Sequence, residues 1–192
     1  MVKGDIVELY KSKNDVFTIK DIALIWKENN FNNLKSKIKY YTDKGKLFKI
    51  RRGIYAKTKD YNILEAANKL YSPSYISFET ILLKEGIIFQ YSQEIFLVAP
   101  LSKQIKINKR KIIYRKLKDE ILLNKKGIIY EDNYYRASKE RAFMDMIYLN
   151  KNYYFDNLRT LDWRKCFKML DIYKQKSLEK ALNSYYKNYS NV

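Results

Sequence analysis

Residues 1–30 contain two stretches in which apolar side chains recur at helical spacing. The first predicted helix has its apolar face at Ile6, Val7 and Tyr10, with Leu9 beside it. Thr18 is followed three residues later by Asp21, the pattern of an N-cap with an acidic first turn. The second predicted helix therefore follows Thr18, and its apolar face consists of Ile19, Ile22, Ala23 and Trp26. Asn29 and Asn30 interrupt the pattern and predict a turn.

A third helix is predicted after this turn. Its buried stripe consists of Leu34, Ile38 and Tyr41. Asn32 or Asn33 can serve as its N-cap, and Gly45 is expected to end it. The other face is polar and carries Lys35, Ser36, Lys39 and Tyr40.

Two short β-prone runs, LFKI and IYAK, follow the third helix and predict a hairpin. Between them lie Arg51, Arg52 and Gly53, and glycine supplies the positive φ that a tight turn requires. Alternation along the strands places Leu47 and Ile54 against the helices and directs Lys46 and Lys49 outward. Three helices followed by a hairpin predict a winged helix-turn-helix domain over residues 1–60.

Residues 61–192 are predicted to form a second domain that begins with two helices. Helical spacing runs from the start of this range and ends before Pro73, which forces a break. The segment SYISFETILLKEG predicts a second helix that Gly86 ends. Its N-cap is expected at Ser74 or Ser77.

Five further β-prone runs are separated by short polar links, and they read EIFLVA, KQIKI, KIIYRKL, GIIYE and YYRA. They predict a small, mostly antiparallel sheet. Ser138 then begins another helix, and a helical tail follows from Leu161 to Tyr189. The predicted fold class is therefore α+β, with an N-terminal winged helix-turn-helix followed by a C-terminal α/β domain.

The charge of the chain is strongly positive. Lys and Arg total 39 against 21 Asp and Glu, a formal net charge of +18. AT-rich codon usage explains part of this excess, but Glu also has such codons and is not raised. A field of this sign favours a nucleic-acid or membrane partner, and no long basic amphipathic helix supports the membrane. Because there is no run of about 18 apolar residues and the sequence MVKGDIVELYK lacks the apolar centre of a signal peptide, we expect a cytoplasmic protein.

The residue inventory argues against an enzyme. The chain has no His and a single Cys, which excludes His-based catalysis, thiolate metal clusters and an internal disulfide. Cys166 lies beside Phe167 and Leu170 and is expected to be a buried small hydrophobe. A metal-dependent nuclease would need converging carboxylates, and no motif spacing joins Glu79, Asp119, Glu120, Glu131 and Asp132. We expect no catalytic residue, no metal and no cofactor.

Positive charge is concentrated on the third helix and the hairpin. Ten Lys and Arg residues lie between Lys35 and Lys59, against the single acid Asp43. The first residues of a recognition helix meet base edges in the major groove, and Asn can read adenine. The predicted DNA contacts are Asn32, Asn33, Lys35, Ser36, Lys39 and Tyr40 from the helix and Lys49, Arg51 and Arg52 from the hairpin. Helix capping and a solvated charged face are the alternative interpretation.

A second basic run extends from Lys103 to Lys118 without an acidic residue. Its candidate contacts are Lys103, Lys106, Lys109, Arg110, Lys111 and Arg115. The run predicts either a second nucleic-acid surface or solvated strand edges that lysines protect from aggregation. An RNA-binding module, in which some of the 19 tyrosines stack on bases, is a further alternative, although most of them lie at core spacing.

Two segments of the second block are more distinctive than the winged helix. They are SPSYISFETILLKEGII, from Ser72 to Ile88, and ASKERAFMDMIYLN, from Ala137 to Asn150. Their charged residues are expected to form ion pairs that hold helices on the sheet: Glu79, Glu140, Arg141 and Asp145. Both segments resemble the signature segments of the AbiEi antitoxin family, and the resemblance covers most of the chain up to Asn150.

The resemblance implies a function as well as a fold. AbiEi-like proteins join a winged helix with a basic hairpin to an α/β antitoxin domain, and they serve bacterial toxin-antitoxin and abortive phage infection systems. They repress their own operon, so the implied partner is double-stranded operator DNA. The implied toxin resembles a nucleotidyltransferase, and in such type IV pairs the two proteins need not form a stable complex. Lys35, Lys39, Arg51 and Arg52 match the basic positions of the family, whereas Ser138 and Lys139 before Glu140 depart from its usual last signature helix.

Overall fold

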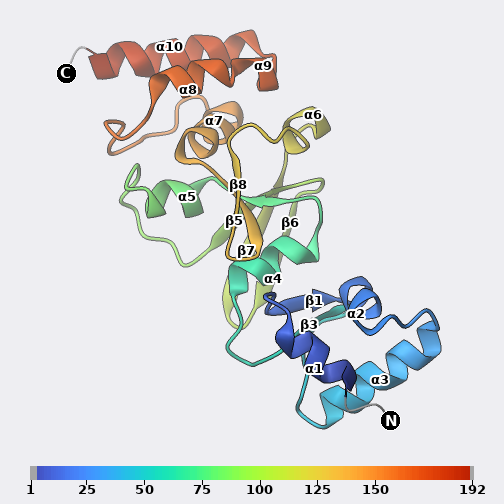
Figure 1. Cartoon of the computed structure of the whole chain (residues 1–192). Helices are drawn as coiled ribbons and strands as arrows, with labels where there is room; N and C mark the ends of the chain where they lie inside the picture. The colour runs from blue at the N-terminus through green and yellow to red at the C-terminus, as the bar shows by residue number, and fades with distance from the viewer. Residues whose placement is uncertain (1–3, 191–192) are drawn as a thin grey trace. The chain divides into compact units, whose positions relative to one another are not determined.

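A computed structural model gives the fold of residues 4–190, which divide into one compact unit ending at Leu70 and another beginning at Tyr71 (Figure 1). Each unit combines helices with its own β-sheet, so the α+β class is confirmed. The boundary follows the helix Ile63–Leu70, which belongs to the first unit.

The first unit is built around a three-stranded antiparallel sheet of order β1-β3-β2. Its elements in chain order are α1 (Gly4–Lys11), β1 (Val16–Thr18), α2 (Ile19–Trp26), α3 (Phe31–Asp43), β2 (Phe48–Arg51), β3 (Ile54–Ala56) and α4 (Ile63–Leu70). The predicted stripe of α3 is buried in one core with Leu9, Phe17, Ile22, Trp26 and Leu47. The predicted third helix and hairpin are therefore both present, and the helix packs through the face that its periodicity indicated.

The start of α2 is also confirmed. The side-chain oxygen of Thr18 accepts a hydrogen bond from the N–H of Asp21 at 3.1 Å, and the Asp21 carboxylate accepts the N–H of Thr18 at 2.8 Å. This reciprocal pair satisfies two backbone donors that the first turn of a helix otherwise leaves without an acceptor.

The buried face of α1 differs from the predicted one. Ile6 and Leu9 are buried, whereas Val7 and Tyr10 are each 45% exposed. Apolar residues occur around much of this short helix, so only its packing partners select the face that is buried. The Tyr10 hydroxyl donates to the backbone oxygen of Lys46 at 2.8 Å, which explains its position at the rim of the core.

Helix α4 is tied to the first unit by a buried carboxylate. Glu65 is fully buried and accepts the backbone N–H groups of Asp15 and Val16 at 3.1 and 3.2 Å. It also forms an ion pair with Lys69 at 3.0 Å, one helical turn further along α4. Because Glu65 accepts the buried backbone N–H groups at the start of β1, α4 belongs to the first unit rather than to the second.

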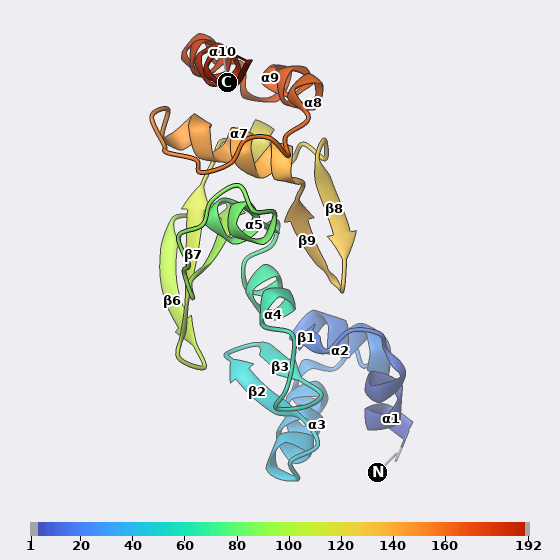
Figure 2. The same ribbon diagram turned by 90° about the vertical axis from the view of Figure 1, so that its left-hand side faces the viewer.

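The second unit contains a six-stranded sheet and most of the helices. Its elements are β4 (Tyr75–Ile76), α5 (Glu79–Lys84), β5 (Ile95–Ala99), β6 (Lys103–Ile107), β7 (Arg110–Lys116), α6 (Asp119–Leu122), β8 (Ile128–Glu131), β9 (Tyr134–Ala137), α7 (Lys139–Leu149), α8 (Trp163–Lys168), α9 (Leu170–Tyr173) and α10 (Lys176–Ser190). All five β-prone runs are strands. The strand order is β6-β7-β5-β4-β9-β8, and Figure 2 shows β6 and β8 at opposite edges.

This sheet is larger and more mixed than predicted. Strand β7 inserts between β5 and β6, so it runs parallel to β5 and antiparallel to β6. Strand β4 likewise pairs in parallel with β9, while β8 closes the other edge in antiparallel fashion. Short links suggest neighbouring antiparallel strands, but here the chain reaches the edge first and returns to the interior.

The predicted helix over SYISFETILLKEG is wrong at its start. Tyr75 and Ile76 form β4 and pair with Val98 and Leu97 of β5. The helix α5 begins only at Glu79, after Phe78 with a positive φ of 54°. Neither Ser74 nor Ser77 caps it, because the N-cap position is taken by Phe78 and no side chain bonds the first turn. Its predicted end holds, since Gly86 has a φ of 67°.

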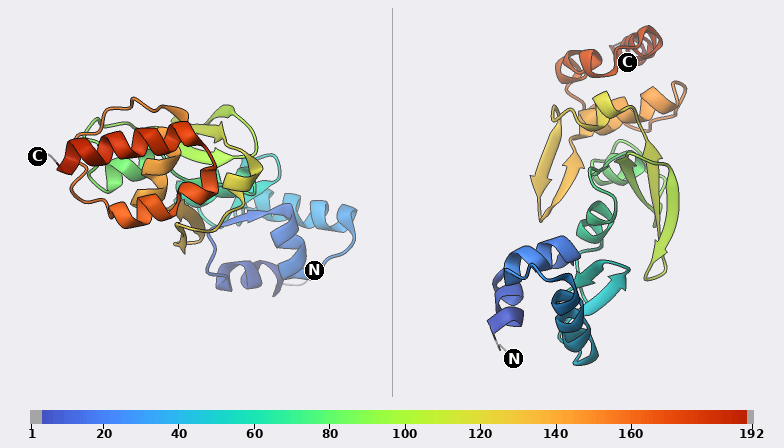
Figure 3. Two further views of the ribbon diagram at one scale, coloured as in Figure 1. Left: turned by 90° about the horizontal axis from the view of Figure 1, so that it is seen from above. Right: turned by 90° about the vertical axis from the view of Figure 1, so that its right-hand side faces the viewer.

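The carboxy-terminal helices pack on α7, on the side away from the sheet (Figures 2 and 3). The predicted cap is confirmed, because Ser138 accepts the N–H of Arg141 at 3.2 Å. Cys166 of α8 is buried, and this burial raises the pKa of its thiol. Within residues 4–190, none of the helices is long and apolar enough to cross a membrane.

Candidate nucleic-acid interface

The turn before α3 determines which side chains α3 exposes. Helix α2 ends at Trp26, Lys27 follows it with a left-handed φ of 52°, and Asn30 caps α3. The Asn30 side-chain oxygen accepts the N–H groups of Asn32 and Asn33 at 3.0 and 3.1 Å. The prediction of Asn32 or Asn33 as the cap is therefore wrong, because the helix starts earlier, and both side chains instead lie exposed in its first turn.

Helix α3 separates a buried apolar face from an exposed polar one. All six predicted contacts on this helix are exposed, and they are Asn32, Asn33, Lys35, Ser36, Lys39 and Tyr40. Their spacing of three and four residues places them on neighbouring positions of one surface. Lys35 lies over the ring of Phe31, 4.2 Å from its centroid, and Lys39 forms an exposed pair with Asp43 at 2.7 Å. These contacts hold the two ammonium groups on the exposed surface without burying them.

Lys37 has a different role from its basic neighbours. Its ammonium lies 3.0 Å from Asp5 and 3.1 Å from Glu28, so it joins α3 to α1 and to the turn after α2. The backbone N–H of Asn30 and the Lys37 ammonium lower the pKa of Glu28. Composition alone does not separate this structural lysine from the exposed ones, because the two acids come from distant parts of the sequence.

The β2–β3 hairpin exposes the remaining three predicted contacts, Lys49, Arg51 and Arg52. Gly53 has a φ of 82°, so it provides the turn that was expected of it. The backbone N–H of Ile19 donates to the Gly53 oxygen at 3.1 Å, which fixes the tip of the hairpin against the start of α2. The arginines at the tip are thus exposed side chains on an anchored backbone.

The second basic run divides into exposed and paired residues. Lys103, Lys106, Lys109 and Arg110 are exposed on the β6–β7 hairpin. Lys111 pairs with Glu94 at 2.7 Å, and Arg115 pairs with Glu79 at 2.6 Å. The Arg115 guanidinium also lies over the rings of Phe78 and Phe96, 4.8 and 4.6 Å from their centroids. Two of the six predicted residues are therefore engaged in ion pairs, and the expected ion pair of Glu79 is confirmed.

A buried polar cluster joins the segments Ser72–Ile88 and Ala137–Asn150. Asp145 is fully buried on α7 and accepts hydrogen bonds from Ser77 at 2.8 Å, Tyr173 at 2.7 Å and Tyr75 at 3.3 Å. The expected ion pair of Arg141 and Asp145 forms at 3.2 Å but lies within α7, so the hydrogen bonds of Asp145 to Tyr75 and Ser77 are what join this helix to the β4 region. Burial raises the pKa of Asp145, and the Arg141 charge and the hydroxyl donors oppose that rise.

The remaining donors of Arg141 are satisfied by backbone and hydroxyl oxygens. They reach the carbonyls of Ile121 at 2.6 Å and Lys126 at 2.8 Å, and the Tyr75 hydroxyl at 2.9 Å. Burial, with the Asp145 charge, raises the pKa of Tyr75 and of Tyr173 well above its ordinary value. A closed and fully satisfied network of this kind rigidifies an interior rather than receiving a substrate. Its tyrosines carry no sequence signal, because they come from segments far apart in the chain.

The carboxylates weighed for a nuclease do not converge. Glu79 is paired with Arg115, and Glu131 is held by Arg136, which lowers its pKa. Asp119 and Glu120 are exposed at the start of α6. Among the described residues, no group of three or more His, Cys, Asp or Glu side chains could hold a metal ion.

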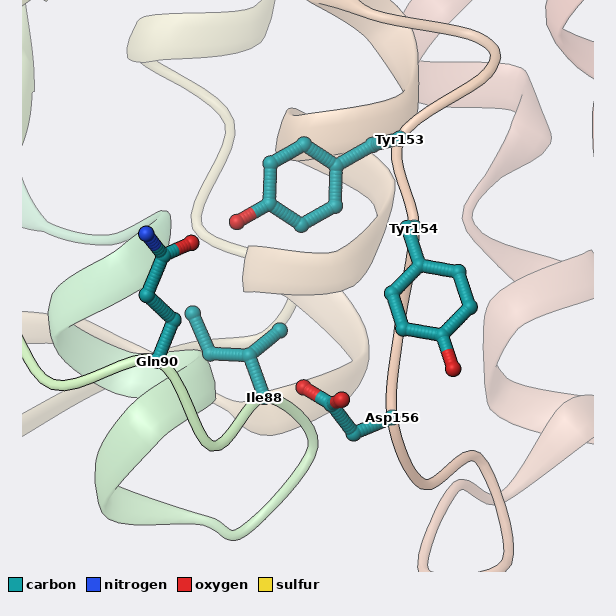
Figure 4. A pocket seen from close by; sticks show the side chains of 5 residues that line it. All are labelled: Ile88, Gln90, Tyr153, Tyr154 and Asp156. Carbon is teal, nitrogen blue, oxygen red and sulfur yellow. The ribbon is translucent and has the colours of Figure 1, made fainter.

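A shallow pocket of about 230 Å³ lies between the segment after α5 and the segment after α7 (Figure 4). Its lining consists of Ile88, Gln90, Tyr153, Tyr154 and Asp156. One oxygen of Asp156 accepts the N–H of Phe89 at 2.8 Å, so this carboxylate holds the two segments together. Pockets for small ligands are commonly about 300–1,000 Å³, which makes this one a surface depression between two loops.

No protein-family model matches the chain, and a search of curated proteins finds no similar sequence.

Proposed function

We propose that the first unit binds double-stranded DNA as a winged helix-turn-helix, with α3 in the major groove and the β2–β3 hairpin on the adjoining backbone. The element order α1, β1, α2, α3, β2, β3 and the sheet order β1-β3-β2 support this assignment. The observation that carries it is that every predicted contact on α3 and on the hairpin is exposed, while the opposite face of α3 closes the core.

The side chains have roles that suit this geometry. Asn32 and Asn33, in the first turn of α3, can pair with adenine edges, because the first residues of a recognition helix reach the bases. Lys35 and Lys39 supply positive charge along the same face. Arg51 and Arg52 at the anchored hairpin tip can contact phosphates or a minor groove, where arginine is favoured. The +18 net charge adds attraction that does not depend on sequence.

The biological role that we propose is that of an antitoxin that represses its own operon and counteracts a nucleotidyltransferase-like toxin. It rests on the two segments that resemble the AbiEi signatures. These segments meet through the bonds of Asp145 to Tyr75 and Ser77. Direct contact with the toxin is not part of the proposal.

The hairpin assignment is tested by salt-dependent DNA binding. A duplex from the chain's own promoter region is titrated with wild type and with the double variant Arg51→Ala, Arg52→Ala, while salt is varied. Each lost phosphate contact lowers the slope of log K against log salt by about 0.9, so the double variant should lose about two units of slope. Lys109→Ala with Arg110→Ala, at the tip of the other basic hairpin, is the matched control and should change the slope less.

Equal binding by wild type and the Arg51 and Arg52 variant would contradict the proposed role of the hairpin. Tighter binding to single-stranded RNA of the same sequence than to the duplex would favour an RNA-binding regulator instead.

A further inference from the structure

The first residue of α3 is a large apolar side chain that the fold leaves exposed. Phe31 is 54% exposed, and it belongs neither to the core of the first unit nor to the partly buried residues packed against that core. It does not anchor the start of the helix either, because Asn30 caps α3 and the buried stripe begins at Leu34. The packing of the first unit therefore does not account for an aromatic residue at this position.

Phe31 is held within the exposed polar surface of α3. The Lys35 ammonium lies 4.2 Å from the centroid of its ring, and a cation attracted to an aromatic face restricts the orientation of that ring. Spacing of four residues places Phe31 in one row with Lys35 and Lys39, and the exposed Asn32 and Ser36 form the neighbouring row. This face therefore presents one ring bordered by polar and basic groups, rather than the contiguous apolar patch that marks a protein-binding surface.

The major groove of DNA contains an apolar group that suits such a ring. Thymine presents its C5-methyl group there, and phenylalanine is one of the side chains that contact it. The first residues of a recognition helix are the ones that reach base edges, and Phe31 is the first residue of α3. Its neighbour Asn32 carries an amide that can pair with N6 and N7 of adenine. Two adjacent residues at the start of α3 thus suit the two bases of A·T pairs.

We infer that Phe31 is a specificity-determining residue of the DNA interface, where its ring contacts the C5-methyl group of a thymine in the major groove. This inference rests on the proposed winged helix-turn-helix function. The contact with Lys35 orients the ring before DNA binds, so the ring loses little conformational freedom on binding. Removing one methyl group from water corresponds to about fourfold in the dissociation constant. The basic residues attract DNA of any sequence, whereas Phe31 favours sites that carry thymine at the contacted position.

Uracil interference with the full chain tests this inference on a promoter whose operator has not been mapped. A duplex from the chain's own promoter region carries deoxyuridine, which lacks only the methyl group, at scattered thymine positions. Bound and free molecules are separated, cleaved at uracil and compared position by position. With wild type, molecules that lack the contacted methyl group should be depleted from the bound fraction, and with Phe31→Ala this depletion should disappear. Phe89→Ala, which removes a 64% exposed phenylalanine of the second unit, is the matched control and should keep the wild-type pattern.

Titrations with single-site duplexes measure the size of the effect. Deoxyuridine at a depleted position should raise the dissociation constant of wild type about fourfold and leave that of Phe31→Ala unchanged. The variant should fold, because Phe31 lies outside the core and alanine favours a helix. A wild type that binds the promoter duplex without any depleted position, or a Phe31→Ala variant with the wild-type pattern, would overturn the role of Phe31 and leave the proposed function standing. A wild type that does not bind the duplex would overturn both.

Discussion

Replacing Asp145 by alanine should destabilise the second unit more than any other single removal of a carboxylate in it. The side chain is fully buried and joins four groups from four segments: Arg141 of its own helix, Tyr75 of β4, Ser77 after β4, and Tyr173 of α9. Alanine removes the counter-charge of Arg141 and leaves the hydroxyl donors of Ser77 and Tyr173 without their acceptor.

The structure gives the size of this effect. Breaking a buried ion pair by removing one partner typically destabilises by about 3–5 kcal/mol. Each buried hydroxyl left without its acceptor adds about 1–3 kcal/mol. Because a domain is stable by only about 5–15 kcal/mol, Asp145→Ala should remove a large part of the free energy of unfolding. Ser77→Ala deletes only one of these hydrogen bonds to a charged group and should lower the stability by about 1.5–3 kcal/mol.

Urea unfolding measured by tryptophan fluorescence is a suitable assay, because Trp26 lies in the first unit and Trp163 in the second. In a Trp26→Phe background the signal reports the second unit alone. Asp171→Ala, which removes an exposed carboxylate on α9, is the control and should leave the transition in place. A variant Asp145→Ala with the wild-type midpoint would refute the view that this network holds α7, α9 and the sheet together.

Three further predictions follow from contacts of single residues. In the folded chain the pKa of Tyr173 lies well above that of an unfolded tyrosine, so stability should be full below about pH 10 and fall as the pH rises further; Tyr173→Phe should make that fall shallower in unfolding titrations at alkaline pH. Glu65→Ala should destabilise the first unit by about 3–5 kcal/mol, because it leaves Lys69 and two backbone N–H groups without their partner. A fragment of residues 1–60 lacks Glu65, so it should show no cooperative unfolding transition by circular dichroism, whereas a fragment of residues 1–70 should show one. Asn30→Ala removes the cap of α3 and should lower the free energy of unfolding of the first unit by about 1 kcal/mol, measured by urea unfolding followed by circular dichroism, whereas Asn33→Ala should leave it unchanged.

The elements of the fold were predictable wherever the local signal was strong. The capping box at Thr18, the stripe of α3 and the five β-prone runs needed only spacing and residue type. The two-residue strand β4 was missed because pairing with β5, and not its own propensity, makes it extended. The parallel pairs of the sheet were missed for a related reason, since chain order does not specify which strands become neighbours.

The candidate interface was predictable in its exposed residues and not in its internal bonds. Charge and periodicity were enough to place Lys35 and Lys39 on the open face of α3. They could not show that Lys37 is held by Asp5 and Glu28, nor that Asn30 takes the capping position. Such contacts join residues from different elements, or depend on a helix that starts two or three residues earlier than predicted, and only the folded backbone determines them.

The most direct test of DNA recognition by α3 and the β2–β3 hairpin is an NMR titration of the full chain with a duplex from its own promoter region. The account predicts that backbone amide signals of residues 31–40 and 49–53 shift together and saturate at a defined ratio of protein to DNA. Shifts confined to residues 103–110, or no shifts in α3, would contradict it.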